Sequence, residues 1–198
     1  LMYQKFVQVR GGRNIVIGLR DMDHDLDEIS TAVTDRTRLI FLDNPNNPCA
    51  TLIGKERFAE FLKKLPESVI VVLDEAYVDF VDPAERIDVQ ELIHNPDGIP
   101  AVVALRTFSK AYGLAGLRIG YLFGPAAHVA EMNKVRQPFN TNSLAQVAAV
   151  ASLEDERHLR RVVRLNKRER RLLEGELHSL GFSTLPSEGN FLLVDIGR

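Results

Sequence analysis

The sequence predicts an α/β fold in which helices cover a mostly parallel sheet. Short apolar runs alternate along the chain with amphipathic stretches, a pattern typical of successive strand–helix units. The runs Val69–Leu73 and Ala101–Leu105 are apolar at every position, which indicates strands buried on both faces. The chain has 198 residues, of which 45% are hydrophobic and 26% charged, a composition typical of a globular protein.

Other elements are expected before the first of these strands. Asn14–Leu19 is predicted to be a short strand, and Leu39–Leu42 a strand that ends abruptly at polar residues. Asp25 with Glu28 three residues later has the spacing of a capping box, which predicts that a helix begins there. Apolar side chains then recur at the spacing of one helix face at Phe58, Phe61, Leu62 and Leu65.

A further strand is predicted over Ile119–Phe123, close behind the strand that ends at Thr107 and Phe108. Only residues 109–118 separate the two, which is too short a connection for a crossover helix. The sequence therefore predicts that this strand is antiparallel to its neighbour in an otherwise parallel sheet.

The last third of the chain is predicted to be mainly helical. Residues 141–152 are rich in Ala and Val and predict a helix packed in the interior. A long, charged, amphipathic helix is expected over Glu154–Leu177, and Phe191–Val194 predicts a final strand. We expect residues 1–153 to form one large domain, and 154–198 to form a linking helix and the start of a small α+β domain.

Charge, the length of apolar runs and cysteine content argue against nucleic-acid binding, a membrane span and an internal disulfide. The 25 Lys and Arg nearly balance the 27 Asp and Glu, so no general attraction to nucleic acid is expected. No apolar run approaches the roughly 20 residues of a membrane span, so no membrane contact is expected. With Cys49 as the single cysteine, an internal disulfide is impossible and a cytoplasmic location is expected. The abrupt ends at Leu1 and Arg198 suggest a fragment of a longer protein.

Polar clusters follow three of the predicted strands, at Asp43–Pro48, Asp74–Tyr77 and Thr107–Lys110. In an open α/β sheet, ligands bind outside the carboxyl ends of the strands. Because parallel strands end at the same edge, we expect the three clusters to form one site.

These clusters contain the groups that pyridoxal phosphate chemistry requires. A lysine can form a Schiff base with the cofactor aldehyde, and a carboxylate can keep the pyridine nitrogen protonated. A phenol and a carboxamide can bind the ring oxygen, while hydroxyls and a guanidinium, here Arg118, can bind the phosphate.

The same residues carry a resemblance to a known family. The chain resembles fold-type I pyridoxal-phosphate aminotransferases, and within them the histidinol-phosphate aminotransferase group, essentially from end to end. The matching segments are Asn44–Pro48, Asp74–Tyr77, Thr107–Arg118 and Phe139–Gln146. The resemblance implies a three-layer α/β large domain, a homodimer, and transfer of an amino group from histidinol phosphate to 2-oxoglutarate in histidine biosynthesis.

The resemblance also implies roles for seven residues. Lys110 would carry the Schiff base and move a proton at the substrate, and Asp74 would pair with the pyridine nitrogen. The other five would bind the cofactor, at its ring oxygen (Asn47 and Tyr77) or at its phosphate (Thr107, Ser109 and Arg118).

The chain departs from the family pattern in two ways. The family usually continues the Asn-Pro pair with Thr-Gly, whereas this chain has Cys49-Ala50. In addition, the family's earlier phosphate loop, its ring-stacking aromatic residue and its late carboxylate-binding arginine fall outside this sequence.

Other interpretations have less support from the sequence. The same fold also serves aromatic amino-acid aminotransferases and carbon–sulfur lyases, and a truncated, non-catalytic protein is a further alternative. The run Val69–Glu75 also fits the magnesium-binding strand of a nucleotide hydrolase, but no G-x-x-x-x-G-K-[ST] loop is present. The Arg-rich stretch Arg157–Arg171 has acidic residues within and beside it, so it predicts a solvated helix face.

Overall fold

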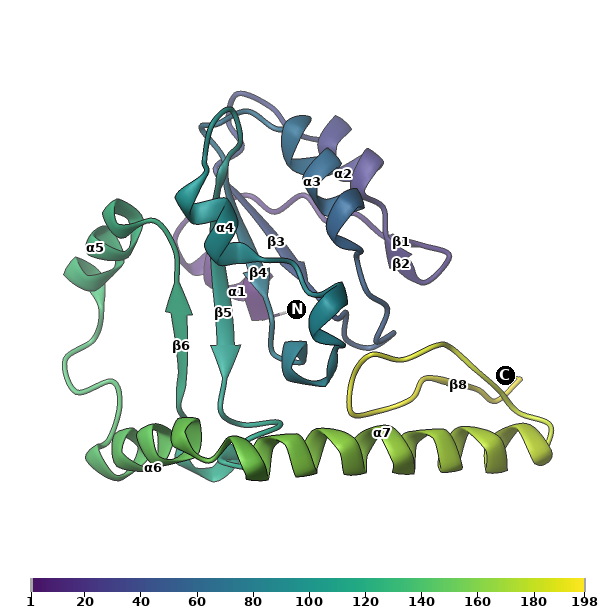
Figure 1. Ribbon diagram of the computed structural model, residues 1–198. Coiled ribbons are helices and arrows are strands. Elements are labelled where there is room, and N and C mark those ends of the chain that lie inside the picture. Colours follow the sequence, from purple (N-terminus) through teal and green to yellow (C-terminus); the bar gives the residue numbers. More distant parts are fainter. Residues whose placement is uncertain (1, 198) are drawn as a thin grey trace.

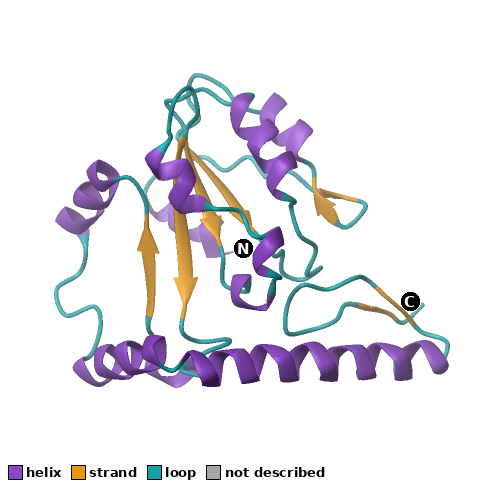
Figure 2. Ribbon diagram, in the orientation of Figure 1, coloured by secondary structure: helices purple, strands orange, loops and turns teal. Residues whose placement is uncertain are grey.

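The computed structural model describes residues 2–197 and shows helices around a central four-stranded sheet (Figures 1 and 2). The helices are α1 (Met2–Val9), α2 (Leu26–Thr31), α3 (Lys55–Lys63), α4 (Val89–His94), α5 (Ala126–Val135), α6 (Ser143–Glu154) and α7 (Glu156–Ser179). The central strands are β3 (Leu39–Asp43), β4 (Ile70–Asp74), β5 (Ala101–Thr107) and β6 (Gly120–Phe123). Short hairpins are formed by β1 (Leu19–Arg20) with β2 (Asp23–His24), and by β7 (Ser183–Thr184) with β8 (Val194–Asp195).

The strands of the central sheet run in the predicted directions. β3, β4 and β5 are parallel, and β6 pairs with β5 in the antiparallel sense. β6 comes so close to β5 that a Cβ atom on Gly120 would lie 2.7 Å from the carbonyl oxygen of Arg106. Glycine at this position therefore allows β6 to pair fully with the end of β5.

Helices α2, α3 and α4 cover one face of the sheet and form the main core with it (Figure 1). The predicted apolar face of α3 supplies Phe58, Phe61 and Leu62, each no more than 2% exposed. These side chains meet alternate residues of the strands, such as Leu42 and Leu73. The opposite face carries α1, so the sheet lies between two helical layers.

The capping contact of α2 confirms that the helix begins where the sequence predicts. The carboxylate of Asp25 accepts a hydrogen bond of 3.0 Å from the amide of Glu28. This bond satisfies one of the amide groups that a helix leaves unpaired in its first turn.

The chain after α6 is dominated by one long helix. Asp155 ends α6 and also caps α7, accepting a bond from the amide of His158. The apolar side of α7 packs on Tyr77 and Phe80 through three residues, Leu159, Val162 and Val163. Among residues 2–197, no helix is both long and apolar enough to cross a membrane.

Two expectations about secondary structure and packing are wrong. Asn14–Leu19 is not a strand apart from Leu19, and Ile15 and Val16 are 58% and 65% exposed. β-branched side chains favour a strand, but within the described chain no strand pairs with residues 14–18, so the strand does not form. The helix over 141–152 exists as α6, but it is buried only along Ala145 and Ala149, while its larger apolar side chains face outward.

The predicted strand Phe191–Val194 is shorter than expected and shifted toward the C-terminus. It overlaps β8 only at Val194. Phe191 instead packs edge-on against Tyr77, with 5.2 Å between the ring centroids. Its carbonyl oxygen accepts a bond of 2.6 Å from the hydroxyl of Ser187, within the loop that joins β7 to β8.

Replacing Leu73 by Ala should lower the free energy of unfolding by about 3 kcal/mol, because it leaves a cavity in the core. Leu73 lies on β4 and is completely buried in the main core, between the sheet and the helices that cover it. Leu39, which is 46% exposed at the start of β3, provides a control whose replacement by Ala should cost less than about 1 kcal/mol. Denaturant titration of both variants measures the difference, and equal losses would contradict this account of the core.

Candidate active site

The ends of the parallel strands bring the predicted polar clusters to one edge of the sheet. Asp43, Asp74 and Leu105 are direct partners across β3, β4 and β5. An open pocket of about 410 Å³ lies at the ends of β4 and β5, within the size range of small-molecule sites. Its lining includes five of the seven predicted site residues, namely Asp74, Thr107, Ser109, Lys110 and Arg118.

Lys110 is exposed, but buried side chains lie close to it on both sides in the sequence. Phe108 is 4% exposed and packs on the rings of Tyr112 and Tyr121, while Ala111 is 1% exposed. The flanking side chains therefore hold the short segment after β5 in place, and Lys110 lines the pocket.

The remaining two predicted residues, Asn47 and Tyr77, lie next to Lys110. The side-chain amide of Asn47 donates a hydrogen bond of 2.9 Å to the hydroxyl of Tyr77. The ammonium nitrogen of Lys110 lies 5.1 Å from the centroid of the Tyr77 ring, a cation–π contact. The structure thus brings all seven residues into one group, although Asn47 and Tyr77 do not line the pocket itself.

The side of the pocket formed by Thr107, Ser109 and Arg118 can bind an anion. The amide of Ser109 donates to the hydroxyl oxygen of Thr107 at 3.1 Å, which shapes the turn after β5. Arg118 has a left-handed backbone with φ of 55°, which is uncommon for a residue with a side chain. Such strain is typical of functional segments, and here it lies at a residue that lines the pocket. One guanidinium nitrogen of Arg118 donates a bond of 2.8 Å to the carbonyl of Ala115.

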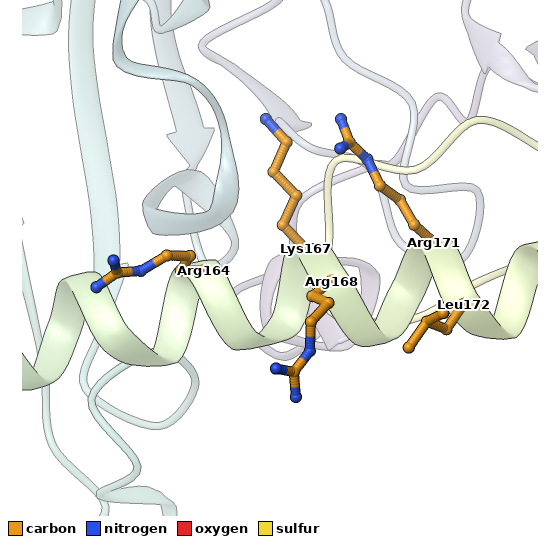
Figure 3. A pocket seen from close by; sticks show the side chains of 5 residues that line it. All are labelled: Arg164, Lys167, Arg168, Arg171 and Leu172. Carbon is orange, nitrogen blue, oxygen red and sulfur yellow. The ribbon is translucent and has the colours of Figure 1, made fainter.

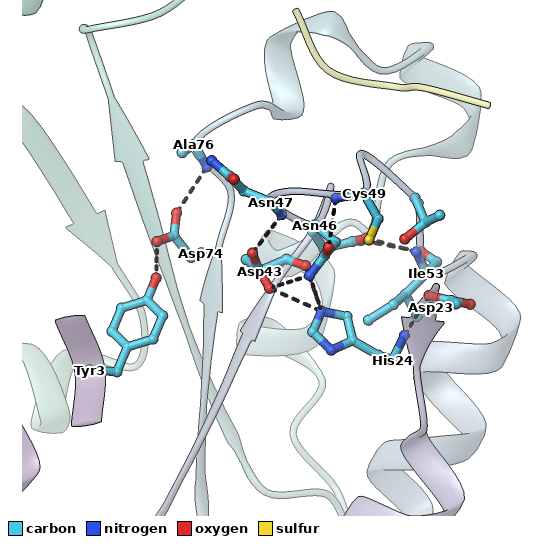
Figure 4. A network of polar contacts seen from close by, with 12 residues as sticks. Tyr3, Asp23, His24, Asp43, Asn46, Asn47, Cys49, Ile53, Asp74 and Ala76 are labelled. Carbon is cyan, nitrogen blue, oxygen red and sulfur yellow. Dashed lines mark hydrogen bonds and ion pairs between the residues drawn. The ribbon is translucent and has the colours of Figure 1, made fainter. Parts of the chain in front are cut away.

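The carboxylate of Asp74 is held by two donors (Figure 4). One oxygen accepts a bond of 3.1 Å from the amide of Ala76, and the other accepts a bond from the phenol of Tyr3. Tyr3 stacks on Phe41 with 4.7 Å between the ring centroids. Burial and then the contact with Asp74 raise the pKa of Tyr3, so its phenol keeps the proton that it donates.

Tyr3 and Arg106 lie at the site, although the sequence analysis assigned neither of them a role. No periodicity or motif marks Tyr3, because its contact with Asp74 joins residues 71 positions apart. Arg106 lines the pocket and donates a bond of 2.7 Å to Glu75, which is 2% exposed. Burial raises the pKa of Glu75 although the positive charge of Arg106 opposes this shift.

The unusual Cys49-Ala50 pair does not disrupt the loop after β3. Ala50 adopts a left-handed conformation with φ of 59°, a backbone geometry that glycine adopts most easily. Its amide donates to the carbonyl of Asn46 at 2.8 Å, which closes the turn. Alanine therefore occupies a glycine-type position here without opening the loop.

A second pocket of about 370 Å³ lies along α7, away from the strand ends (Figure 3). Four cationic side chains and one leucine of this single helix line it, namely Arg164, Lys167, Arg168, Arg171 and Leu172. None of the predicted site residues contributes to it. Because no carboxylate, phenol or amide is among its lining residues, we place the candidate active site at the strand ends.

With this geometry established, comparison with known proteins identifies the family. Residues 1–198 match the family described as aminotransferase class I and II. The chain belongs to this family. The match confirms both the resemblance and the α/β fold class that the sequence predicted.

The relatives of this chain include proteins named histidinol-phosphate aminotransferase. It is 52% identical over 196 residues to the histidinol-phosphate aminotransferase of Desulfotalea psychrophila, covering 99% of this chain and 52% of that protein. The corresponding protein of Moorella thermoacetica is 47% identical, with 99% and 50% covered. The crystal structure of the Sinorhizobium meliloti histidinol-phosphate aminotransferase in complex with pyridoxal-5'-phosphate has a TM-score of 0.90 at 34% identity, covering 99% of this chain and 52% of that one. The chain thus spans about half the length of these relatives.

Replacing Tyr3 by Phe should lower the free energy of unfolding by about 1 kcal/mol, because it removes a hydrogen bond to Asp74 and keeps the stacking on Phe41. Tyr112 provides a matched control, since no hydrogen bond from its hydroxyl is found among residues 2–197. Its replacement by Phe should change stability by less than about 0.5 kcal/mol. Denaturant titration that finds equal losses for the two variants would argue against the Tyr3–Asp74 contact.

Proposed function

We propose that the chain carries the cofactor-binding centre of a pyridoxal-phosphate-dependent aminotransferase. The observation that carries this proposal is the placement of Lys110, beside Asp74 in the pocket and against the Tyr77 ring. A lysine, a carboxylate, a phenol and a carboxamide in one group match the donors and acceptors of this cofactor. The hydroxyls and guanidinium on the same pocket match its phosphate.

Each residue has a task that follows from its chemistry. Lys110 would bind the cofactor covalently through its side-chain nitrogen, and once released would take a proton from the donor's Cα. Asp74 would accept a hydrogen bond from the pyridine nitrogen, since each of its oxygens has a second lone pair free. When bound, pyridoxal phosphate supplies an aldehyde that takes up the amino group and a ring that delocalises the electron pair left at Cα.

The other predicted residues would orient the cofactor. Asn47 and Tyr77 are already joined by a hydrogen bond, so both can meet the ring oxygen together. Thr107, Ser109 and Arg118 would bind the phosphate, with the arginine able to form two parallel, charge-assisted bonds. These contacts would fix the ring plane relative to Lys110 and so aim the proton transfer.

The names of the relatives favour one substrate pair. We propose histidinol phosphate as the amino donor and 2-oxoglutarate as the acceptor, as part of histidine biosynthesis. The relatives from Desulfotalea psychrophila and Moorella thermoacetica both bear the name histidinol-phosphate aminotransferase and are 52% and 47% identical to this chain. Because the chain spans about half of those proteins, this activity is proposed for the whole enzyme of which this sequence provides the cofactor centre.

We propose that residues 1–153 belong to the large domain and that 154–198 link it to a small domain. A homodimer and a cytoplasmic location are likewise predicted, the first from the family resemblance and the second from the single cysteine.

Replacing Lys110 by Ala in the whole enzyme should abolish transamination of histidinol phosphate while leaving the fold intact, because Lys110 is exposed and its buried neighbours stay in place. Lys134, an exposed lysine paired with Glu131 on α5, provides the matched control, and its replacement by Ala should leave activity unchanged. Activity is measured by formation of glutamate from 2-oxoglutarate, and circular dichroism checks the fold. Retained turnover in the Lys110 variant would exclude the proposed mechanism.

A further inference from the structure

The carboxylate of Asp43 has no role in the proposed chemistry, yet it is bound by donors on both of its oxygens (Figure 4). One oxygen accepts from the ring nitrogen Nε2 of His24 at 3.0 Å and from the side-chain amide of Asn46 at 3.1 Å. The other accepts a short bond of 2.7 Å from the main-chain amide of Asn47. Asp43 therefore connects a histidine on β2 to the loop that carries Asn47.

Asn47 is tethered at two points. Its main-chain amide donates to Asp43, and its side-chain amide donates to the hydroxyl of Tyr77. The residue is itself exposed, so packing does little to fix it. The position of its carboxamide therefore depends on these two hydrogen bonds.

The far side of the same loop is held independently. Asn44 accepts a bond of 2.7 Å from the amide of Ile53 and donates one of 3.2 Å to its carbonyl. Both residues are buried. Loss of the contact at Asp43 should thus release Asn47 without unfolding the rest of the loop.

His24 is well placed to control Asp43. Its side chain is 12% exposed, and Nε2 lies 3.0 Å from both the carboxylate and the main-chain carbonyl of Asp43. Since both of these nearest groups are acceptors, we assign a hydrogen to Nε2; the side-chain amide nitrogen of Asn46 lies farther away, at 3.4 Å. The other charged groups near the imidazole are Asp23 on the same strand and Arg57 on α3, which donates a bond of 2.6 Å to the carbonyl of His24.

We propose that His24 is a positioning residue for the cofactor site, acting through Asp43 to hold Asn47 where its carboxamide meets Tyr77 and the cofactor ring oxygen. The inference rests on the proposed function for its last step, the binding of the ring oxygen. The chain from His24 through Asp43 to Asn47 rests on the hydrogen bonds of this structure alone.

The strength of this link should depend on pH, through the protonation of His24. Burial lowers the pKa of His24, but the hydrogen bond and charge of Asp43 outweigh burial and leave it raised above 6.5. Because folding raises this pKa, the stabilisation from the His24–Asp43 contact is fully present at pH values below the pKa of the unfolded state. It is lost as pH rises through the pKa of the folded state. The hold on Asn47 should therefore weaken as His24 loses its proton.

The first test needs no cofactor and measures hydrogen exchange of individual amides in the chain. Replacing His24 by Ala should lower the protection factor of the Asn47 amide by about tenfold, the loss expected when a hydrogen bond is weakened. The Ile53 amide, on the independently held side of the loop, should keep its protection. Exposed His94, replaced by Ala, is the control and should change neither amide.

A conservative variant separates positioning from a merely structural role. His24→Gln can still donate a hydrogen bond to Asp43, so it should restore most of the protection at Asn47. In the unaltered chain this protection should fall as pH rises through the pKa of His24, whereas in His24→Gln it should not depend on pH in that range. Unchanged protection of Asn47 in His24→Ala, or equal loss at Ile53, would overturn the inference.

The second test measures the affinity for pyridoxal phosphate by its visible absorption. His24→Ala should weaken binding several-fold, and His24→Gln should bind nearly as the unaltered chain does. If the unaltered chain binds and His24→Ala binds equally well, the inference fails while the proposed function stands. If the unaltered chain does not bind, the proposed function fails, and the exchange experiment still decides whether His24 controls Asn47.

Discussion

The register between β3, β4 and β5 is the constraint on which the candidate site depends. Parallel pairing places Asp43, Asp74 and Leu105 side by side at one edge of the sheet. A shift of β4 by one residue would turn Asp74 toward the core and bring Leu73 to the pocket face, because neighbouring side chains point to opposite faces. Burial of Leu73 beneath the helices fixes the register, so the hydrophobic core also positions the polar site.

The last residue of each parallel strand also shapes the loop that follows it. In all three strands a side-chain oxygen of that residue accepts a hydrogen bond from a main-chain amide a few positions later. The pairs are Asp43 with Asn47, Asp74 with Ala76, and Thr107 with Ser109. The site is thus built from three similar turns on a rigid edge, which limits the movement of side chains that must meet one small molecule.

Sequence alone predicted the parts of the fold that depend on local patterns. The uninterrupted apolar residues of β4 and β5 required burial on both faces, and the short connection before β6 required an antiparallel strand. It could not predict contacts between distant segments, such as Tyr3 with Asp74 or His24 with Asp43. The expected strand over Asn14–Leu19 failed for the same reason, since a strand needs a partner and its own residues do not reveal one.

The most direct test of the central claim is to add pyridoxal phosphate to the chain, reduce the product with borohydride and map the modified peptide. The account predicts a visible absorption band on binding and a single label on Lys110, since this lysine lies in the pocket with Asp74. A label on a different lysine, or labels spread over several exposed lysines with no visible band, would contradict the placement of the cofactor at the strand ends.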